Sequence, residues 1–390
     1  MSSTKKAKDA APSALRWKEV AAALLAYKAW TFALVYASVH MLSGVFNATN
    51  YSGNFHWPED APITLWSVFK TWDAQHYLQL AQEGYRAGSA SNQFYPLWPM
   101  AMRAGAFLLG GDYLFSGLIL SNLFSWLGAV LFYVEAEKRY GEKTADAALL
   151  LLLAYPGALF LQFAFTESLF LLLAVLLLRF LREERPGATA LAAFLLPLTR
   201  PQGILIAPAV WYGVWKAREG RGLRGSDFLA AAAPLAGFAA YLAFMRATTG
   251  DALAGFHAYA AMVVQPPTVG KLFDVAGFVR EFVHVTAIHG YTGSLIDRVW
   301  FVVWAASLWP LWRRDKVLFA YAVPLGLVPA MSLGMVSYTR HFLLVLPVFF
   351  LGGIALAGEE RKWVLRPLLA VLFSLQIAFL IQHVNDYWVG

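Results

Sequence analysis

Cysteine is absent from the 390-residue chain, and charged residues are scarce. Without a thiol, the chain forms no disulfide, holds no thiolate-bound metal and has no cysteine nucleophile. Charged residues make up 14% of the sequence, whereas soluble domains carry about 25%. The phosphate-binding pattern G-x-x-x-x-G-K-[ST] is also missing, which argues against an ATP-driven pump.

Apolar residues are what the chain has in excess. Hydrophobic residues account for 59% of the sequence and aromatic residues for 16%. A soluble globule of this size has no room to bury so much apolar surface behind a polar skin. Apolar runs recur along nearly the whole chain, which excludes a single-span receptor. The composition predicts an all-α polytopic membrane protein, because helices satisfy their own backbone hydrogen bonds in lipid.

Eleven apolar runs are candidates for membrane helices, each of which needs about 20 residues to cross a bilayer. The runs lie at 19–41, 113–135, 144–157, 166–182, 188–200, 203–216, 227–247, 297–313, 316–332, 341–357 and 365–382. The odd number predicts that the two ends lie on opposite sides of the membrane. The first run follows Lys5, Lys6 and Lys8 and contains Lys28, which favours a retained helix over a cleaved signal peptide.

The distribution of positive charge sets the expected orientation. With the N-terminus in the cytoplasm, about two thirds of the Lys and Arg residues lie in short inner segments, as cytoplasmic loops require. Two long segments, 42–112 and 248–296, then lie on the periplasmic, extracellular or lumenal side. We therefore expect one integral-membrane domain over 1–390 in the cell membrane, with its active chemistry on the non-cytoplasmic face.

The outer segments contain amphipathic stretches that predict helices at the membrane interface. One is expected at 63–83, where apolar and aromatic residues recur at helical spacing. A second helix, either re-entrant or interfacial, is expected at 94–110, and a third helix in the later outer loop. The residues that carry the first and third patterns are Leu65, Trp66, Phe69, Trp72, His76 and Leu80, and Phe273, Phe278, Phe282 and Val285.

Asp73 is the sharpest candidate for chemistry, since an ionisable group near the membrane is functional by default. A carboxylate there can accept a proton from an attacking hydroxyl; the alternative is a solvated loop acid or a helix cap. His76 lies one turn further on the same helix face, and either shares a proton or metal with Asp73 or serves in packing. Because no third ligand has suitable spacing, no metal site is predicted.

Two arginines and one glutamate are expected at the outer face. Arg200 in LTRPQG and Arg340 in SYTRHF can each bind a phosphate through two parallel hydrogen bonds. The alternative for both is snorkelling toward lipid headgroups. Glu167 in FTESLF begins a helix on the same side. Its charge either complements the helix N-terminus or orients a substrate hydroxyl or an arginine.

At these residues the chain resembles the PIG-V-like mannosyltransferases of the GT-C superfamily. Five stretches are similar to family motifs and occur in family order. They are WDAQHYLQLAQEGY at 72–85, FYPLWP at 94–99, FTESLFLLL at 165–173, LTRPQG at 198–203 and YTRHFLLVLP at 338–347. The chain departs from the family in FYPLWP, where the family has F-F-P-L-Y-P, and at Phe165 and Thr166, where it often has Tyr and Ser. It also lacks the longer loops of eukaryotic members.

The resemblance implies a GT-C fold and inverting transfer of a hexose, most commonly mannose, from a polyprenyl-phosphate donor. Asp73 takes the position of the catalytic acid and is the candidate base, and Arg200 and Arg340 take the positions that hold the donor phosphate. Further candidates for donor binding are Glu167, His76, Trp72, Tyr77, Tyr95, Gln202 and His341. Since arginine alone can serve a monophosphate leaving group, no metal or other cofactor is expected. Partners are the donor, membrane lipids and an unidentified glycan, lipid or protein acceptor, without nucleic acid.

Two other functions fit the same composition. A transporter or flippase of a lipid-linked sugar requires ionisable groups near the midplane and broken helices in paired repeats. The sequence has few midplane charges and no clear repeat. A non-catalytic partner in envelope assembly would tolerate the loss of Asp73.

Overall fold

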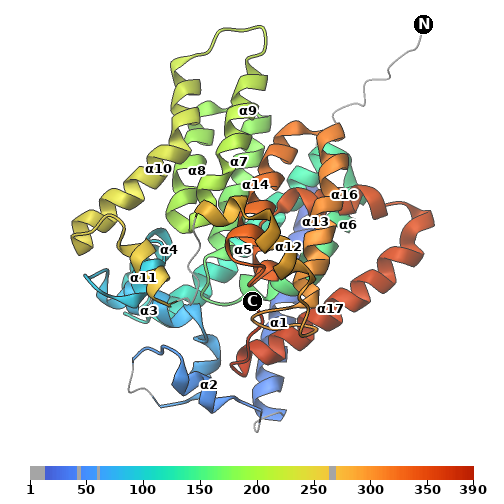
Figure 1. Ribbon diagram of the computed structural model, residues 1–390. Helices are drawn as coiled ribbons and strands as arrows, with labels where there is room; N and C mark the ends of the chain where they lie inside the picture. The colour runs from blue at the N-terminus through green and yellow to red at the C-terminus, as the bar shows by residue number, and fades with distance from the viewer. Residues whose placement is uncertain (1–13, 42–44, 59–61, 263–268) are drawn as a thin grey trace, which may run out of the picture.

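The computed structural model describes residues 14–41, 45–58, 62–262 and 269–390, and within them it is built from helices without a strand (Figure 1). The helices are α1 (Ala14–Met41), α2 (Ala48–Gly53), α3 (Asp73–Glu83), α4 (Leu97–Leu108), α5 (Tyr113–Tyr140), α6 (Glu142–Ala154), α7 (Glu167–Arg182), α8 (Pro186–Thr199), α9 (Ala207–Ala217), α10 (Gly225–Thr249), α11 (Ala254–Met262), α12 (Val275–Val283), α13 (Leu295–Arg314), α14 (Lys316–Ser332), α15 (Tyr338–Phe342), α16 (Leu346–Leu356) and α17 (Lys362–Val384). Lys5, Lys6 and Lys8 lie outside the described residues.

The all-α class is confirmed, and a helix occupies each of the eleven predicted apolar runs. These helices are α1, α5 to α10, α13, α14, α16 and α17. Among the described residues, four helices are long and apolar enough to cross a membrane, namely α1, α5, α10 and α17. Three others, α8, α14 and α16, are apolar but shorter.

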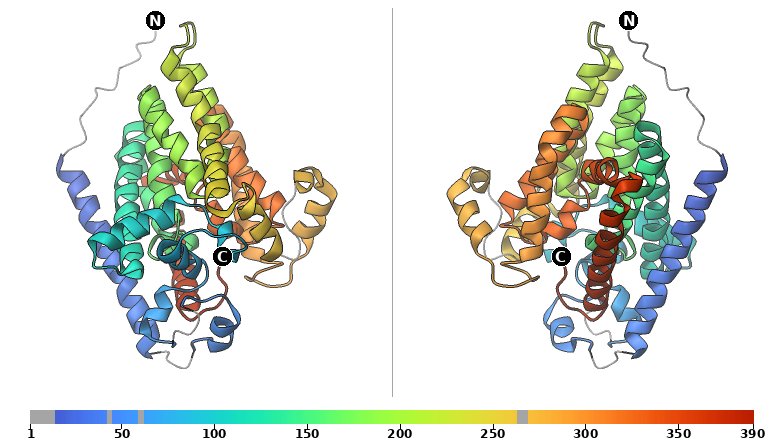
Figure 2. Two further views of the ribbon diagram at one scale, coloured as in Figure 1. Left: turned by 90° about the vertical axis from the view of Figure 1, so that its left-hand side faces the viewer. Right: turned by 90° about the vertical axis from the view of Figure 1, so that its right-hand side faces the viewer.

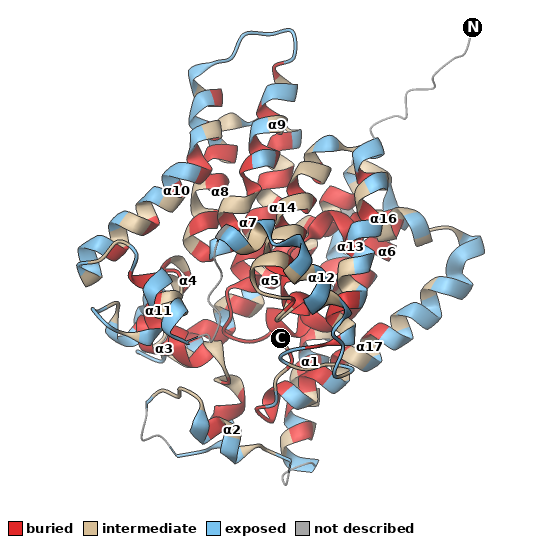
Figure 3. Ribbon diagram, viewed as in Figure 1, coloured by how far each residue is buried: buried red, intermediate tan, exposed pale blue. Residues whose placement is uncertain are grey.

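The core runs along the middle of the bundle, where α5 packs against α7 and α8 against both α7 and α10. Buried residues concentrate on these helices, whereas α17 shows a broad exposed face (Figure 3). Large apolar side chains such as Phe115, Phe228 and Trp363 are exposed on the outside. Exposed apolar side chains on long helices are the arrangement that a lipid environment stabilises.

The short helices α2, α3, α4 and α11 gather at one end of the bundle, and the loop between α9 and α10 lies at the opposite end (Figures 1 and 2). Helix α7 connects the two ends, since its 16 residues span about 24 Å from Glu167 to Arg182. At the far end, the buried Glu135 carboxylate pairs with Arg139 at 2.6 Å and Arg182 at 2.7 Å. This ion cluster ties α5 to α7.

The outer segments differ from the expectation in one respect. Residues 63–83 do not form a single helix: a short 3₁₀ helix spans Leu65–Phe69, and α3 begins only at Asp73. Trp72 interrupts the helix, because its φ of 51° lies in the left-handed region. The side chains from Ala74 to Ala81 are buried, so α3 packs inside the protein, whereas Leu65 and Trp66 are exposed.

Two other amphipathic predictions are confirmed as helices. The stretch 94–110 contains α4, and the later outer loop contains α12, whose Phe278 and Phe282 pack on Phe301 of α13. The predicted run 341–357 is divided into α15 and α16, because Val345 between them leaves the helical region at ψ 62°.

Candidate functional site

Four separate segments bring charged side chains together at the α3 end of the bundle. Asp73 and Glu167 are the first residues of α3 and α7, and Arg340 lies in α15. Arg200 follows α8 with an extended backbone, φ −168° and ψ 160°, as the residue before a proline prefers. Gly203 keeps this turn compact, because a Cβ there would collide with the Leu196 carbonyl oxygen.

A buried carboxylate joins the two arginines. Oε1 of Glu167 accepts hydrogen bonds from Nη1 of Arg200, at 2.6 Å, and from Nε of Arg340. The Glu167 side chain has no exposed surface. A buried charge is tolerated only where opposite charge and hydrogen bonds compensate its desolvation, and two guanidinium groups do so here. Glu167 therefore fixes the distance between the two arginines.

The cluster extends in both directions from Glu167. Nη1 of Arg340 lies 2.5 Å from Oδ2 of Asp73. On the other side, Nε of Arg200 donates to Oε1 of Gln202 at 3.0 Å, and Nε2 of Gln202 lies 3.3 Å from Nδ1 of His341. Six residues predicted from the sequence thus form one continuous chain of contacts. Its order is Asp73, Arg340, Glu167, Arg200, Gln202 and His341.

Hydrogen-bonding capacity remains at this cluster. Neither Nη2 of Arg200 nor Nη2 of Arg340 donates a hydrogen bond to a described residue, and Oδ1 of Asp73 accepts none from one. Asp73 is the most open of the four charged groups, with 29% of its side chain exposed against 10% or less for the others. The cluster can therefore bind an anion at the arginines while presenting a carboxylate oxygen at its edge.

Aromatic rings and a backbone clamp hold Arg340 in place. Its guanidinium lies 4.9 Å from the ring centre of Phe160 and 4.8 Å from that of Phe165, within the range of cation–π attraction. The preceding residue, Thr339, donates its N–H and its hydroxyl to Oδ1 of Asp297, both at 2.6 Å.

Tyr155 completes this clamp, since its hydroxyl donates to the Thr339 carbonyl at 2.7 Å. Asp297 is buried at the start of α13. Asp297 was not among the residues predicted from the sequence, although it is a carboxylate at the end of a predicted membrane helix, which is the signal that singled out Glu167.

Two more predicted residues border the cluster. Tyr77 is buried beside it and meets Phe165 edge to face. Burial, reinforced by the negative charge of Asp73, raises the Tyr77 pKa, so its hydroxyl stays protonated and can donate a hydrogen bond. Trp72, directly before Asp73, is half-buried and packs against Trp388 with ring centres 5.1 Å apart.

The other two predicted residues make separate contacts. His76 is stacked between Phe55, at 4.2 Å, and Phe94, at 4.8 Å, and its Nδ1 lies 2.8 Å from the Ser91 hydroxyl. Tyr95 is stacked on Tyr241 at 3.9 Å with nearly parallel rings. The structure thus brings neither ring into the chain of contacts around Glu167.

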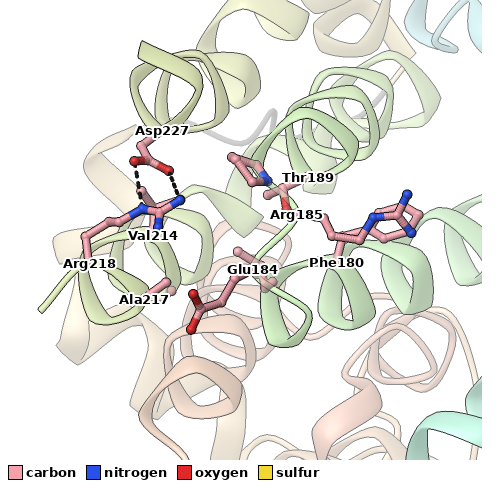
Figure 4. A pocket seen from close by; sticks show the side chains of 11 residues that line it. Phe180, Glu184, Arg185, Thr189, Val214, Ala217, Arg218 and Asp227 are labelled. Atoms are coloured by element: carbon pink, nitrogen blue, oxygen red, sulfur yellow. Dashed lines mark hydrogen bonds and ion pairs between the residues drawn. The ribbon is translucent and has the colours of Figure 1, made fainter. Parts of the chain in front are cut away.

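A small cavity lies at the opposite end of the bundle, where α7 to α10 meet (Figure 4). Its volume is about 20 Å³, enough for one water molecule. Arg218 pairs there with Asp227 through two hydrogen bonds, of 2.8 and 3.2 Å (Figure 4). None of the predicted site residues lines this cavity. Within the described part of the chain, no three His, Asp or Glu side chains are grouped to hold a metal.

Comparison with known proteins gives distant structural similarities only. No family model matches the sequence, and no curated protein matches it. Three solved structures of the Archaeoglobus fulgidus oligosaccharyltransferase are similar in part. The structure with zinc and sulfate is 11% identical with a TM-score of 0.45, covering 92% of this chain and 53% of that chain.

The structure of archaeal oligosaccharyltransferase AglB with an inhibitory peptide and a dolichol-phosphate is 10% identical, with a TM-score of 0.44 and coverage of 93% and 56%. A third, tethered with an acceptor peptide, is 11% identical with a TM-score of 0.42 and coverage of 93% and 56%. The chain spans about half the length of these proteins. The resemblance to PIG-V-like mannosyltransferases stays a prediction from the sequence motifs.

Proposed function

We propose that the protein is an inverting membrane glycosyltransferase of the GT-C type. It transfers a hexose, with mannose as the first candidate, from a polyprenyl-phosphate donor to an acceptor on the non-cytoplasmic side. One observation carries this proposal: the guanidinium groups of Arg200 and Arg340 converge on Glu167, and Arg340 also reaches the carboxylate of Asp73. The proposed phosphate site and the proposed base therefore adjoin each other.

The arginines supply the phosphate site. Two guanidinium and two carboxylate charges balance in the resting cluster, and each guanidinium keeps one Nη2 for a ligand oxygen. Charge-assisted hydrogen bonds from arginine to phosphate are among the stronger interactions available to a protein. The same donors stabilise the charge that develops on the phosphate as it leaves.

Asp73 is the proposed base. The acceptor hydroxyl oxygen attacks C1 of the sugar and the C1–O bond to the phosphate breaks. The bonding electron pair leaves on the phosphate oxygen, and the hydroxyl proton moves to Asp73. In the resting cluster Arg340 occupies Oδ2 of Asp73 as its ion-pair partner. A donor phosphate that takes over Arg340 releases Asp73, so donor binding itself prepares the base.

The buried charges bear on the transporter alternative. Glu167 begins α7, and Arg200 follows the end of α8, so both lie at helix ends. Lys28 is buried within α1, where Asn122 and Ser125 accept from it at 3.0 and 2.7 Å. Neutral oxygens that already satisfy its ammonium favour a packing role over an ion pathway.

The test is a transfer and hydrolysis assay with purified protein in nanodiscs. Polyprenyl-phosphate mannose is offered first, then the glucose and arabinose donors, with membrane lipid and protein extract as acceptor. We expect release of polyprenyl phosphate from one donor, and a decrease of about 10²–10⁴-fold in Asp73→Asn. The matched control is Asp251→Asn, which removes a half-exposed carboxylate in the second outer segment.

Three results would contradict the proposal. Near wild-type sugar transfer by Asp73→Asn would show that Asp73 is not the base. Movement of the lipid donor across the vesicle membrane without any sugar transfer would favour the flippase. Protein that neither turns over nor binds any donor would favour the assembly partner.

A further inference from the structure

The segment 385–390, which follows α17, returns to the charged cluster. The N–H of Asn47 donates to the Asn385 carbonyl at 2.9 Å, and Nδ2 of Asn50 donates to the Asp386 carbonyl at 3.0 Å. These two contacts attach the segment to the first outer loop.

The far part of this segment lies against the site. Nε2 of His289, in the second outer loop, lies 3.0 Å from the Val389 carbonyl oxygen. A Cβ built at Gly390 would lie 3.3 Å from the Cβ of Arg340 and 3.1 Å from the Phe160 ring. Segment 385–390 thus forms a wall beside Arg340, and both outer loops hold it there.

Three aromatic rings from different parts of the chain meet at this wall. The ring of Trp388 is edge to face with Trp72, at 5.1 Å and 84°, and with Tyr291, at 4.9 Å and 67°. Trp72 directly precedes Asp73. We call Trp72, Tyr291 and Trp388 the aromatic rim. Half of the Tyr291 surface is exposed, so the rim is open to a ligand on that side.

The rim contains polar groups whose hydrogen bonds are missing. The indole N–H groups of Trp72 and Trp388 are buried, and neither has a partner among the described residues. A buried donor without an acceptor costs free energy, which a bound oxygen can recover. Trp72 also holds a left-handed backbone with φ 51°. Residues in such strained conformations cluster at ligand sites.

A tyrosine of the second outer loop interacts electrostatically with both the aromatic rim and the proposed base. Burial raises the pKa of Tyr259 in α11 to about 12, and Tyr291 and the charge of Asp73 contribute to the shift. Tyr259 therefore lies within electrostatic range of both Tyr291 and Asp73.

We propose that the aromatic rim is a subsite for a pyranose ring of the substrate, an inference that rests on the proposed glycosyl transfer. A pyranose presents an apolar face of C–H groups and an edge of hydroxyl groups. The aromatic faces bury the C–H groups, and the two indole N–H groups donate to hydroxyl oxygens. Large apolar rings with a few placed donors are the usual lining of such sites.

Either of two sugars can supply this ring, because both meet at Asp73. The donor hexose lies between the arginines and Asp73, and a sugar acceptor lies beyond the exposed edge of Asp73. The donor sugar and the acceptor sugar present the same ring chemistry. Hydrolysis of the donor by water distinguishes them, because that reaction requires no acceptor sugar.

The experiment compares Trp388→Ala with Trp388→Phe and with the control Tyr387→Ala. Tyr387 is 40% exposed and makes no ring contact with a described residue. The measurements are the donor KM in hydrolysis, the acceptor KM in transfer, and the inhibition constant of sugar-free polyprenyl phosphate. The last reports only on the phosphate site, so a distorted cluster changes it and a lost sugar contact does not.

For Trp388→Ala we expect a KM about tenfold higher for one sugar substrate, with partial recovery in Trp388→Phe. The inhibition constant of polyprenyl phosphate should stay within twofold of wild type. A higher donor KM in hydrolysis assigns the rim to the donor sugar, and a higher acceptor KM alone assigns it to the acceptor.

Unchanged KM values, or a parallel rise in the inhibition constant, would overturn the inference while the wild type remains active. An inactive wild type that does not bind polyprenyl phosphate is a different result, because it rejects the proposed function itself.

Discussion

The guanidinium of Arg340 pairs with the carboxylate of Asp73 across 267 residues of sequence, with 2.5 Å between Nη1 and Oδ2. The same guanidinium donates through Nε to Glu167. Arg340 is thus the residue at which the carboxylate proposed as base meets the proposed phosphate site. The pairing joins α3 to α15. A change at either Asp73 or Arg340 should therefore alter the other residue in a way that experiments can measure.

Replacing Arg340 by lysine should impair function more than stability. Lysine keeps the positive charge beside Glu167, but its single ammonium cannot reach Glu167, Asp73 and a phosphate oxygen in one planar arrangement. We expect the inhibition constant of polyprenyl phosphate to rise at least tenfold, while the thermal unfolding midpoint falls by only a few degrees. Arg361→Lys, at a half-exposed arginine away from the cluster, is the control. Unaltered phosphate binding in Arg340→Lys would show that the phosphate lies elsewhere.

Loss of Glu167 should destabilise the fold. In Glu167→Ala two arginines that are 10% exposed or less lose their shared carboxylate. Breaking a buried ion pair in this way costs about 3–5 kcal/mol. Glu167→Gln should cost less, since the amide oxygen still accepts from both arginines. Chemical denaturation in detergent measures both, with the exposed Glu360→Gln as control. Equal stability of the alanine and glutamine variants would contradict a role for Oε1 as shared acceptor.

Asp297 should act through Thr339 on the position of Arg340. Asp297→Ala removes the acceptor for both the N–H and the hydroxyl of Thr339. We expect polyprenyl-phosphate binding to weaken about tenfold, which corresponds to a loss of roughly 1.4 kcal/mol of binding free energy. Thr339→Ser keeps the hydroxyl and should bind like wild type, whereas Thr339→Val should bind more weakly. If Asp297→Ala only lowered the unfolding midpoint and left the inhibition constant unchanged, Asp297 would serve stability alone.

His76 should make the fold sensitive to mild acid. Burial lowers its pKa to about 4 in the folded protein, opposed in part by the charge of Asp73, whereas an unfolded histidine titrates near 6.5. Between these values the unfolded chain binds the proton and the folded protein does not. Stability therefore rises with pH from about 4 to 6.5 and is lost as the pH falls through that window, by on the order of 3 kcal/mol.

The unfolding midpoint of His76→Gln should depend less on pH across this window than that of wild type. Glutamine does not titrate and can still bond to Ser91, the present partner of His76. His40→Gln, at an exposed position on α1, is the control and should keep the wild-type slope. A wild-type slope in His76→Gln would assign the acid sensitivity to another group.

The functional residues could be predicted only in part. Asp73, Glu167, Arg200 and Arg340 were identifiable as charged residues in an apolar sequence, where each charge has a desolvation cost that demands an explanation. Asp297 carried the same signal and was missed. Trp388 and Tyr291 carried no signal, because aromatic residues are abundant in this chain and are ordinary packing residues in a membrane protein.

The sequence by itself determined the class of the fold and the places of its long helices. Hydropathy is a local property, and a run of apolar residues in lipid forms a helix whatever its neighbours are. Only the tertiary structure decided that Glu167 is shared by two arginines, that α3 begins at Asp73 after a left-handed Trp72, and that segment 385–390 lies beside Arg340. These relations join residues far apart in the chain, so they depend on how the helices pack, which no local pattern specifies.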